Sequence, residues 1–259
     1  MPSLASSSTK VPAGYRLLRL ETVDSTNAEA RRRGEAGEPG PLWIWSLRQS
    51  AGRGRNGRQW QSQHSNLFAS LLIGLSCPLR TASQLALLAG VVAYDTAAKL
   101  LPEEVHSELL LKWPNDVLLK GGKVAGMLLE SASEPAPNRC KVVIGTGINL
   151  ATFPPDLEQL ATSLVTHGGA ATPSAAFETL AAVTDAWLMR WGEGVSFQTV
   201  RRAWLDRAGP TGRPLRVRLY GEEAEGTFAG LDSAGALRLL MSDGVEHRIA
   251  AGDVFFANS

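Results

Sequence analysis

The sequence predicts a protein of the α+β class, in which helices pack on a mixed β-sheet and a small β-barrel follows. Three observations lead to this prediction. Strand-length apolar runs follow one another with only turns between them. Longer stretches with helical periodicity interrupt these runs. The pattern changes at Gly209-Pro210, beyond which only short strand-type runs occur. We therefore expect a tail over residues 1–14, a large domain over 15–208 and a small domain over 209–259.

The chain is expected to begin with a tail and a strand–turn–helix unit. Residues 1–14 are mostly small and polar, which is typical of a loosely ordered terminus. A strand is expected over residues 15–21, followed by a turn and a helix that begins at Thr26. Thr26 and Glu29 have the T-x-x-E spacing of a capping box. Arginines 31–33 suit the far end of that helix, where cations are favourable.

The central part of the chain supplies most of the sheet and its helices. Apolar runs bounded by turn residues indicate strands, and longer periodic stretches indicate helices. The expected strands cover residues 42–47, 67–75, 109–113, 116–119, 124–130 and 142–150. The expected helices cover residues 83–101, 174–191 and 196–208. Because several strands are neighbours in sequence, the sheet is expected to be mixed or antiparallel.

The C-terminal segment has a pattern of its own. Residues 215–219 alternate apolar and charged side chains, as a half-buried strand does. Further strand-type runs cover residues 228–231, 236–240 and 245–249, with Gly- and Asp-containing turns between them. A segment of this kind is expected to fold into a small β-barrel of SH3 size.

Composition and charge exclude several classes of function. A net charge of +1 provides no overall attraction to nucleic acid or to a membrane surface. Cys77 and Cys140 lie in no Cys/His cluster, which argues against a structural zinc site and a disulfide framework. No apolar run reaches the roughly 18 residues that a membrane helix needs, and the N-terminus lacks the apolar core of a secretory signal. A cytoplasmic protein without a membrane partner is expected.

The distribution of charge indicates an anion-binding loop. Between Pro39 and Tyr94 there is no Asp or Glu, whereas Arg53, Arg55 and Arg58 alternate there with glycines. Glycine lets a backbone approach a ligand closely, and guanidinium groups bind phosphate or carboxylate through paired hydrogen bonds. The loop is therefore expected to close over an anionic small molecule. A solvated basic loop remains an alternative. An RNA-binding Arg-Gly segment is disfavoured, because no aromatic stacking repeat accompanies it.

A second group of polar residues follows an apolar strand. Lys112 ends the strand, where its ammonium group can neutralise a carboxylate or a phosphate. Pro114 takes the chain out of the strand ladder. Asn115 and Asp116 then present oxygen atoms suited to Mg²⁺ or to a ribose hydroxyl. The alternative is a plain strand–turn–strand unit without a ligand.

Glycines also interrupt two of the expected strands. Gly145 and Gly147 weaken a strand unless something packs closely against its backbone, and a flat ligand would do so. Gly126 follows a hairpin whose turn is expected at Gly121-Gly122, and it shares that hairpin with Lys123. A hairpin that only contributes to the core is the alternative for this segment.

Four segments occur together in one order, and they carry a family resemblance. They are residues 24–27 (DSTN), 49–58 (QSAGRGRNGR), 112–117 (KWPNDV) with 122–126 (GKVAG), and 145–149 (GTGIN). Together they resemble the biotin protein ligase family over about residues 15–259. The resemblance implies a catalytic biotin- and ATP-binding domain of the class II synthetase and biotin/lipoyl ligase type. It also implies an SH3-like C-terminal domain.

The resemblance further implies roles for individual residues. Those expected to contact biotin are Ser25, Thr26, Asn27, Gln49, Gly52, Arg53, Gly54, Arg55, Lys112, Gly126, Gly145 and Gly147. Those expected to contact ATP are Arg53, Arg55, Arg58, Trp60, Lys112, Asn115, Asp116, Lys123 and Asn149. The expected catalytic residues are Lys112, Arg55 and Arg53. Asp116 is expected to face a Mg²⁺ ion that is bound through the nucleotide.

The implied reaction suits these residue types. Biotin would be activated with ATP as biotinyl-5′-AMP, and the biotinyl group would pass to a lysine of a biotin carboxyl carrier protein. Because a carboxylate must attack a negatively charged phosphate, Lys112, the loop arginines and Mg²⁺ would offset the repulsion. The expected small molecules are therefore biotin, ATP and Mg²⁺, with no prosthetic group.

The resemblance also bears on partners and rival functions. Many members of the family carry an N-terminal DNA-binding domain, but only about 14 residues precede the first strand here, too few for a helix-turn-helix domain. DNA is therefore not expected as a partner, whereas the carrier domain of acetyl-CoA carboxylase or a similar carboxylase is. Loop ordering on ligand binding could also produce a homodimer. The rivals are a lipoyl ligase or transferase of the same fold, whose glycine-triplet segment is missing here, and a non-catalytic relative that binds biotin or nucleotide.

Overall fold

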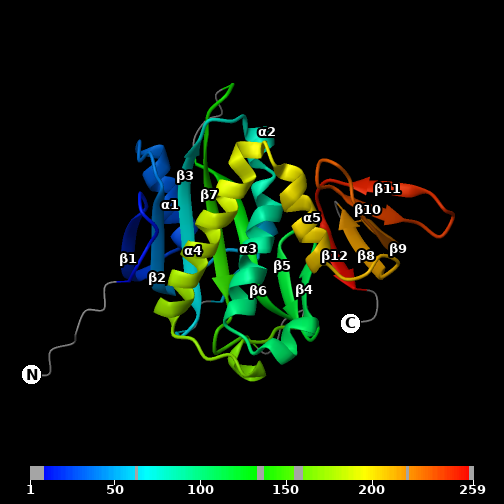
Figure 1. The fold of residues 1–259 in the computed structure, drawn as a ribbon, viewed down its shortest axis with the longest axis horizontal. Helices are drawn as coiled ribbons and strands as arrows, with labels where there is room; N and C mark the ends of the chain where they lie inside the picture. Colours follow the sequence, from blue (N-terminus) through cyan, green and yellow to red (C-terminus); the bar gives the residue numbers. More distant parts are fainter. Residues whose placement is uncertain (1–8, 62–63, 133–136, 155–159, 220–221, 257–259) are drawn as a thin grey trace, which may run out of the picture.

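The larger of two β-sheets forms the body of the molecule (Figure 1). A computed structural model describes residues 9–61, 64–132, 137–154, 160–219 and 222–256. The seven strands of the larger sheet are β1 (Arg16–Val23), β2 (Leu42–Gln49), β3 (Leu67–Leu75), β4 (Leu109–Lys112), β5 (Asp116–Leu119), β6 (Gly122–Ser131) and β7 (Cys140–Ile148). Their order is β1-β2-β3-β7-β6-β5-β4, and only β1 and β2 pair in parallel. The mixed sheet confirms the predicted α+β class.

Helices cover both faces of this sheet, so each face has an apolar layer of its own. They are α1 (Thr26–Glu35), α2 (Leu79–Ala82), α3 (Leu85–Lys99), α4 (Pro173–Trp191) and α5 (Phe197–Arg207), with four short 3-10 helices between elements. Figure 1 shows α3 and α4 lying across one face. Trp45 of β2 stacks on Phe177 of α4 on this side, with ring centroids 5.1 Å apart. On the opposite face, Ala30 of α1 packs against Leu72 and Val143 of the sheet.

The structure corrects the predicted cap of α1. Ser25, not Thr26, is the N-cap residue, because its backbone is extended and its hydroxyl accepts a hydrogen bond from Ala28 N at 3.4 Å. Thr26 is the first helical residue, and its hydroxyl is directed at Gln49 instead. The carboxylate of Glu29 binds arginines of its own helix rather than the helix N-terminus. The expected capping box is therefore wrong, although the helix begins where it was predicted.

Two further expectations on local structure are corrected. The helix expected over residues 83–101 is α3, which begins at Leu85 and ends at Lys99, and the short helix α2 before it was not expected. The turn between β5 and β6 consists of Lys120 and Gly121, which both have positive φ (49° and 81°). Gly122 is already paired with Leu119 in the sheet. Positive φ at both loop positions is the pattern of a type I′ hairpin turn, and it places the turn one residue earlier than expected.

The C-terminal segment forms a second sheet, which is entirely antiparallel. Its strands are β8 (Pro214–Leu219), β9 (Glu222–Leu231), β10 (Leu237–Leu240), β11 (Glu246–Ile249) and β12 (Asp253–Phe256). Their order is β11-β10-β9-β8-β12, so β12 is an edge strand. The strand β12 was not expected from the sequence, because four residues near the chain end are too few for a periodic pattern. This second sheet packs against α5, where the rings of Trp204 and Phe228 make an edge contact.

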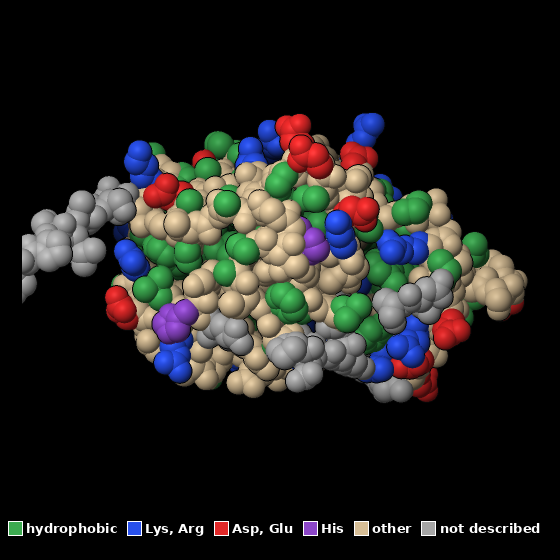
Figure 2. All heavy atoms as spheres, turned by 90° about the horizontal axis from the view of Figure 1, so that it is seen from below, with side chains coloured by type: hydrophobic (Ala, Val, Ile, Leu, Met, Phe, Trp, Pro, Cys, Tyr) green, Lys and Arg blue, Asp and Glu red, His purple; other side chains and the backbone are tan. Residues whose placement is uncertain are grey.

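The surface carries both signs of charge. Figure 2 shows one face of the molecule, on which basic and acidic side chains are interspersed.

Among the described residues, no helix combines the length and the apolar character needed to cross a membrane. Residues 1–8 of the expected tail lie outside the described residues. A concentration of one sign of charge is instead found inside a pocket.

Candidate active site

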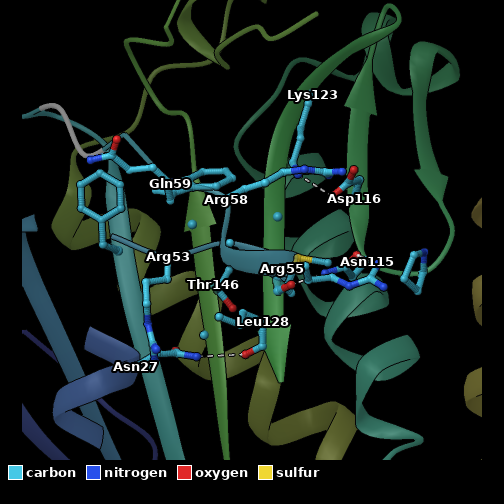
Figure 3. Close-up of a pocket in the computed structure, with 18 of the residues that line it drawn as sticks. Asn27, Arg53, Arg55, Arg58, Gln59, Asn115, Asp116, Lys123, Leu128 and Thr146 are labelled. Atoms are coloured by element: carbon cyan, nitrogen blue, oxygen red, sulfur yellow. Dashed lines mark hydrogen bonds and ion pairs between the residues drawn. The ribbon is translucent and has the colours of Figure 1, made fainter. Parts of the chain in front are cut away.

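A pocket of about 360 Å³ lies on the face of the large sheet that α1 covers (Figure 3). Of the residues expected to bind biotin or ATP, all but Gly52 and Asn149 line it. Lining residues that were not expected are Gln59, Phe68, Trp113, Pro114, Met127, Leu128, Thr146, Asp253, Val254 and Phe255. The four sequence motifs thus meet in one cavity, to which the second sheet also contributes.

The register of the sheet explains why distant motifs meet here. One row of directly paired residues crosses four strands, from Lys112 through Asp116 and Gly126 to Gly147. The next row on the same face passes through Gly145, because side chains two residues apart on a strand point to the same side. The strand pairing therefore places the lysine, the carboxylate and the glycines of three motifs side by side.

At one end of the pocket, a buried polar network holds the first turn of α1. Gln49 Oε1 accepts hydrogen bonds from Thr26 N at 2.8 Å and from Thr26 Oγ1 at 3.1 Å. Ser70 of β3 is fully buried and lies 2.8 Å from Thr26 Oγ1 and 2.6 Å from Asn27 Oδ1. Buried groups with satisfied hydrogen bonds hold a fixed geometry. The polar side chains at this end are therefore held in one arrangement.

The glycines of the pocket are covered by side chains of the protein itself. A Cβ atom at Gly145 would lie 2.0 Å from Asn27 Oδ1. At Gly147 it would lie 2.7 Å from the indole ring of Trp60, and at Gly126 it would lie 3.0 Å from the same ring. The close packing inferred for these glycines therefore exists within the protein, and Trp60 contacts the strands where we expected a ligand.

At the other end of the pocket, two lysines share one carboxylate. Lys112 Nζ lies 3.0 Å from Asp116 Oδ2, and Lys123 Nζ lies 2.6 Å from Asp116 Oδ1. Burial raises the pKa of Asp116, but Lys123 and Lys112 outweigh it and bring the pKa to about 2. Burial lowers the pKa of Lys112, and Asp116 opposes this shift. One ionised carboxylate thus lies between two lysine side chains next to the cavity.

The arginine loop has a defined shape over the pocket. Gly54 N donates to Arg58 O at 2.7 Å, and Trp60 N donates to Gly52 O at 2.9 Å, so the loop closes on itself. Asn56 has a positive φ of 54° at its tip. Each arginine has a partner in the protein: Arg53 with Glu130, Arg55 with Asn115 and Gly252 O, and Arg58 with Asp253.

The residues that sequence reasoning missed come from two places. Glu130 lies on β6, on the same face as Gly126, and the two-residue period of a strand could have shown this. Asp253 and Phe255 belong to β12, whose position beside the pocket depends on the packing of the two sheets. The ring of Phe255 lies 5.8 Å from Lys112 Nζ. No local sequence signal indicates this contact.

Two of the residues expected at the site, Gly52 and Asn149, lie outside the pocket lining, as does the neighbouring Arg48. Gly52 supports the loop through its carbonyl oxygen. Asn149 donates hydrogen bonds to Thr162 O at 3.1 Å and to Lys123 O at 3.4 Å, so it holds the segment behind the pocket. Arg48, which precedes the loop, is exposed. The positions of Gly52 and Asn149 favour supporting roles over direct ligand contacts.

The donor set does not fit a Mg²⁺ ion held directly by Asp116. Both of its carboxylate oxygens are within 3.0 Å of an ammonium group. The described residues contain no group of three or more His, Cys, Asp or Glu side chains that could hold a metal ion. Because Mg²⁺ prefers oxygen ligands with negative charge, a ligand that enters the pocket would have to provide most of them.

The lining of the pocket suits ligands that carry one neutral polar group and several anionic groups. Five cationic side chains line it: Arg53, Arg55, Arg58, Lys112 and Lys123. Only two acidic side chains line it, Asp116 and Asp253. Positive groups fixed in a partly buried site stabilise phosphate and carboxylate charge more strongly than they do in water. Condensation of a carboxylate with a nucleoside triphosphate requires such a site.

Comparisons with known proteins agree with this chemistry. Residues 20–149 match the biotin/lipoate A/B protein ligase family, and residues 211–257 match the biotin protein ligase C-terminal domain. The biotin–[acetyl-CoA-carboxylase] ligase of Paracoccus denitrificans is 37% identical over 243 residues, which cover 92% of this chain and 99% of that protein. The ligase of the same name from Mycobacterium tuberculosis is 32% identical, over 93% of this chain and 90% of that protein.

The fold also has a counterpart among solved structures. The biotin protein ligase from Aquifex aeolicus in complex with biotin and ATP superposes with a TM-score of 0.74, over 93% of this chain and 99% of that chain. The two sequences are 24% identical in this alignment. The similarity therefore extends to both sheets, and it concerns the fold.

Proposed function

Because the chain belongs to the biotin/lipoate A/B protein ligase family, as its four motifs predicted, we infer that it is a biotin protein ligase. The enzyme activates biotin with ATP to biotinyl-5′-AMP and transfers the biotinyl group to a carrier protein. In the first step a biotin carboxylate oxygen bonds to the α-phosphorus and pyrophosphate leaves. In the second, a lysine amine bonds to the carboxyl carbon, AMP leaves and the amine loses a proton.

One observation carries the choice of biotin over lipoate within this family. The segment that matches the biotin protein ligase C-terminal domain includes β12, and Asp253, Val254 and Phe255 of β12 line the same pocket as Lys112 and Arg55. The biotin-type C-terminal domain is thus part of the site rather than a distant appendage.

We propose that the two ends of the pocket divide the work of the first reaction. The neutral network of Thr26, Asn27 and Gln49 would receive the uncharged ring end of biotin, since it offers hydrogen bonds without charge. Lys112 and Arg55 would lie where the biotin carboxylate meets the α-phosphate and would offset the repulsion between the two anions. Much of the rate would come from this placement, because no protein nucleophile is required.

The remaining nucleotide-binding roles follow the positions of the side chains. Arg58 and Lys123 would bind the outer phosphates or the leaving pyrophosphate, and Trp60 would offer its ring to the base. With a pKa of about 2, Asp116 stays ionised at neutral pH and fixes the two lysines rather than accepting a proton. Mg²⁺ would enter with the nucleotide, held mainly by phosphate oxygens.

The proposed protein partner is a biotin carboxyl carrier domain. The named activity of the relative from Paracoccus denitrificans implies a carboxylase as the acceptor. The acceptor lysine would have to reach the activated carboxyl group in this pocket once the adenylate has formed.

Exchange of pyrophosphate into ATP tests the first reaction directly. We expect exchange with biotin, and none with lipoate or without an acid. Lys112→Ala is expected to reduce exchange by about a hundredfold or more, because the charge between carboxylate and phosphate is lost. The matched control Lys99→Ala, at an exposed position in the last turn of α3, is expected to be unaffected. Exchange with lipoate alone would favour a lipoate ligase, and the absence of any exchange would argue for a non-catalytic binding protein.

A further inference from the structure

We propose that Glu130 is a positioning residue that couples the first turn of α1 to the arginine loop. Its carboxylate contacts Asn27 in the turn and Arg53 in the loop, and it lies just outside the pocket lining. In this role it would hold the biotin-binding end of the site and the loop that closes over it in one arrangement. The inference rests on the proposed function only for the identity of the ligand.

The contact with Asn27 fixes the orientation of a buried amide. Asn27 Nδ2 donates to Glu130 Oε2 at 2.7 Å and to Leu128 O at 3.3 Å. Its Oδ1 lies 2.6 Å from Ser70 Oγ, on the opposite side of the amide. Because an ionised carboxylate only accepts hydrogen bonds, a flipped Asn27 would bring its oxygen against Glu130 and Leu128 O. Both N–H groups of the amide are therefore committed, and Asn27 can offer a ligand only its oxygen.

The contact with Arg53 ties the loop to the same carboxylate. Arg53 Nη2 lies 3.1 Å from Glu130 Oε1 and 3.2 Å from Oε2. The arginine side chain is 42% exposed and that of Glu130 is 20% exposed, so water weakens this ion pair but does not replace it. Figure 3 shows Arg53 and Asn27 next to each other at one end of the pocket.

The position of Glu130 on β6 makes it suited to this role. Gly126, Leu128 and Glu130 alternate along one face of the strand, and the first two line the pocket. Glu130 is therefore the next side chain on the pocket face, at the point where the turn and the loop approach each other. It does not need to touch the ligand in order to affect its binding.

Two variants separate the two contacts. Glu130→Gln keeps an oxygen that can accept from Asn27 but removes the charge that holds Arg53, whereas Glu130→Ala removes both. The loop contains three arginines, so trypsin reports its order in the absence of any ligand. We expect cleavage within residues 53–58 to be about fivefold faster in both variants. We expect the Kd for biotin, measured by calorimetry without ATP, to rise about threefold in Glu130→Gln and about tenfold in Glu130→Ala.

The control is Glu246→Gln, which removes a comparable ion pair with Arg238 on the second sheet. It is expected to change neither the cleavage of the loop nor the affinity for biotin. If both Glu130 variants behaved like this control, or if the loop were cleaved faster without any change in biotin affinity, the coupling would be refuted. A wild-type protein that binds no biotin would contradict the proposed function instead, and the cleavage experiment would still decide whether Glu130 holds the loop.

Discussion

At the scale of single residues, the pocket depends on positions where a side chain is absent. Gly145 is the clearest case, because Asn27 Oδ1 occupies the space where its Cβ atom would be. At Gly147 and Gly126, the ring of Trp60 lies against the position that a Cβ atom would take. A substitution at any of these glycines therefore acts on the ligand through another residue of the protein.

A double-mutant cycle tests the pair formed by Gly145 and Asn27. Gly145→Ala is expected to displace Asn27 and to raise the Kd for biotin by about tenfold or more, since the amide would lose its contact with Ser70. Asn27→Ala removes the atoms that collide. The double variant should therefore bind biotin no more weakly than Asn27→Ala alone. Calorimetric titration of the four proteins provides the measurement, and additive losses would contradict direct contact as the cause.

The charge state of Asp116 predicts a particular loss of stability in acid. Its pKa is about 2 in the folded protein, below the ordinary value of 3.8. The ionised form is therefore favoured by folding, and this contribution is complete above about pH 4 and is lost as the pH falls through 2. A shift of this size corresponds to about 2 kcal/mol. Urea unfolding between pH 4 and pH 2 should show a weaker pH dependence for Asp116→Asn than for the wild type. Parallel curves would show that the lysines do not lower this pKa.

At the scale of secondary-structure elements, the edge strand β12 completes the site from the second sheet. Asp253 accepts hydrogen bonds from Arg58 and from Asn56 Nδ2, and Gly252 O accepts one from Arg55 at 3.1 Å. The arginine loop is thus held by β6 on one side and by β12 on the other. Its order depends on elements that are far apart in the sequence.

Removal of the carboxylate on β12 tests this arrangement. In Asp253→Ala, Arg58 and Asn56 lose their shared acceptor, so the loop should spend less time over the phosphates. We expect the KM for ATP to rise by about threefold, a modest effect because Arg58 is half exposed. The control is Asp206→Ala, at an exposed position on α5. An unchanged KM for ATP in Asp253→Ala would mean that β12 does not order the loop.

At the scale of the whole molecule, one apolar core extends through both sheets. Buried residues of α3 and α5 are contiguous with Leu215, Phe228 and Leu237 of the second sheet. Trp113 Nε1 also donates across the junction to Gly235 O at 3.2 Å. Parts that share a core are expected to unfold together rather than in sequence.

Calorimetry of the wild type is therefore expected to show a single thermal transition. Phe228→Ala removes a buried ring that contacts Trp204, and it should lower the free energy of unfolding by about 3 kcal/mol. The same decrease in the free energy of unfolding should be measured whether the spectroscopic probe lies in the large sheet or in the second sheet. Leu240→Ala, on an exposed side chain of the second sheet, is the control and should have little effect. Two separate transitions in the wild type would show that the sheets are independent units.

The fold class, the approximate elements and the motif segments could all be predicted from local sequence patterns. Strand and helix periodicity are local properties, so β3 and β5 are found where they were predicted. The glycine-spaced arginines and the Lys112–Asp116 segment predict an anion-binding site through residue type and spacing. The cap of α1 shows what local patterns cannot predict. Ser25 and Thr26 are both residue types that cap helices, and the hydrogen bond from Thr26 to Gln49 leaves Ser25 as the cap.

Only the tertiary structure decided which groups complete the site. The register of β6 against β7 places Gly126 opposite Gly147, and Trp60 then covers both. Glu130 gains its role from two residues that lie far from it in sequence, and Asp253 gains its role from the packing of one sheet against another. Contacts of this kind depend on strand pairing and on a shared core, which no short stretch of sequence encodes.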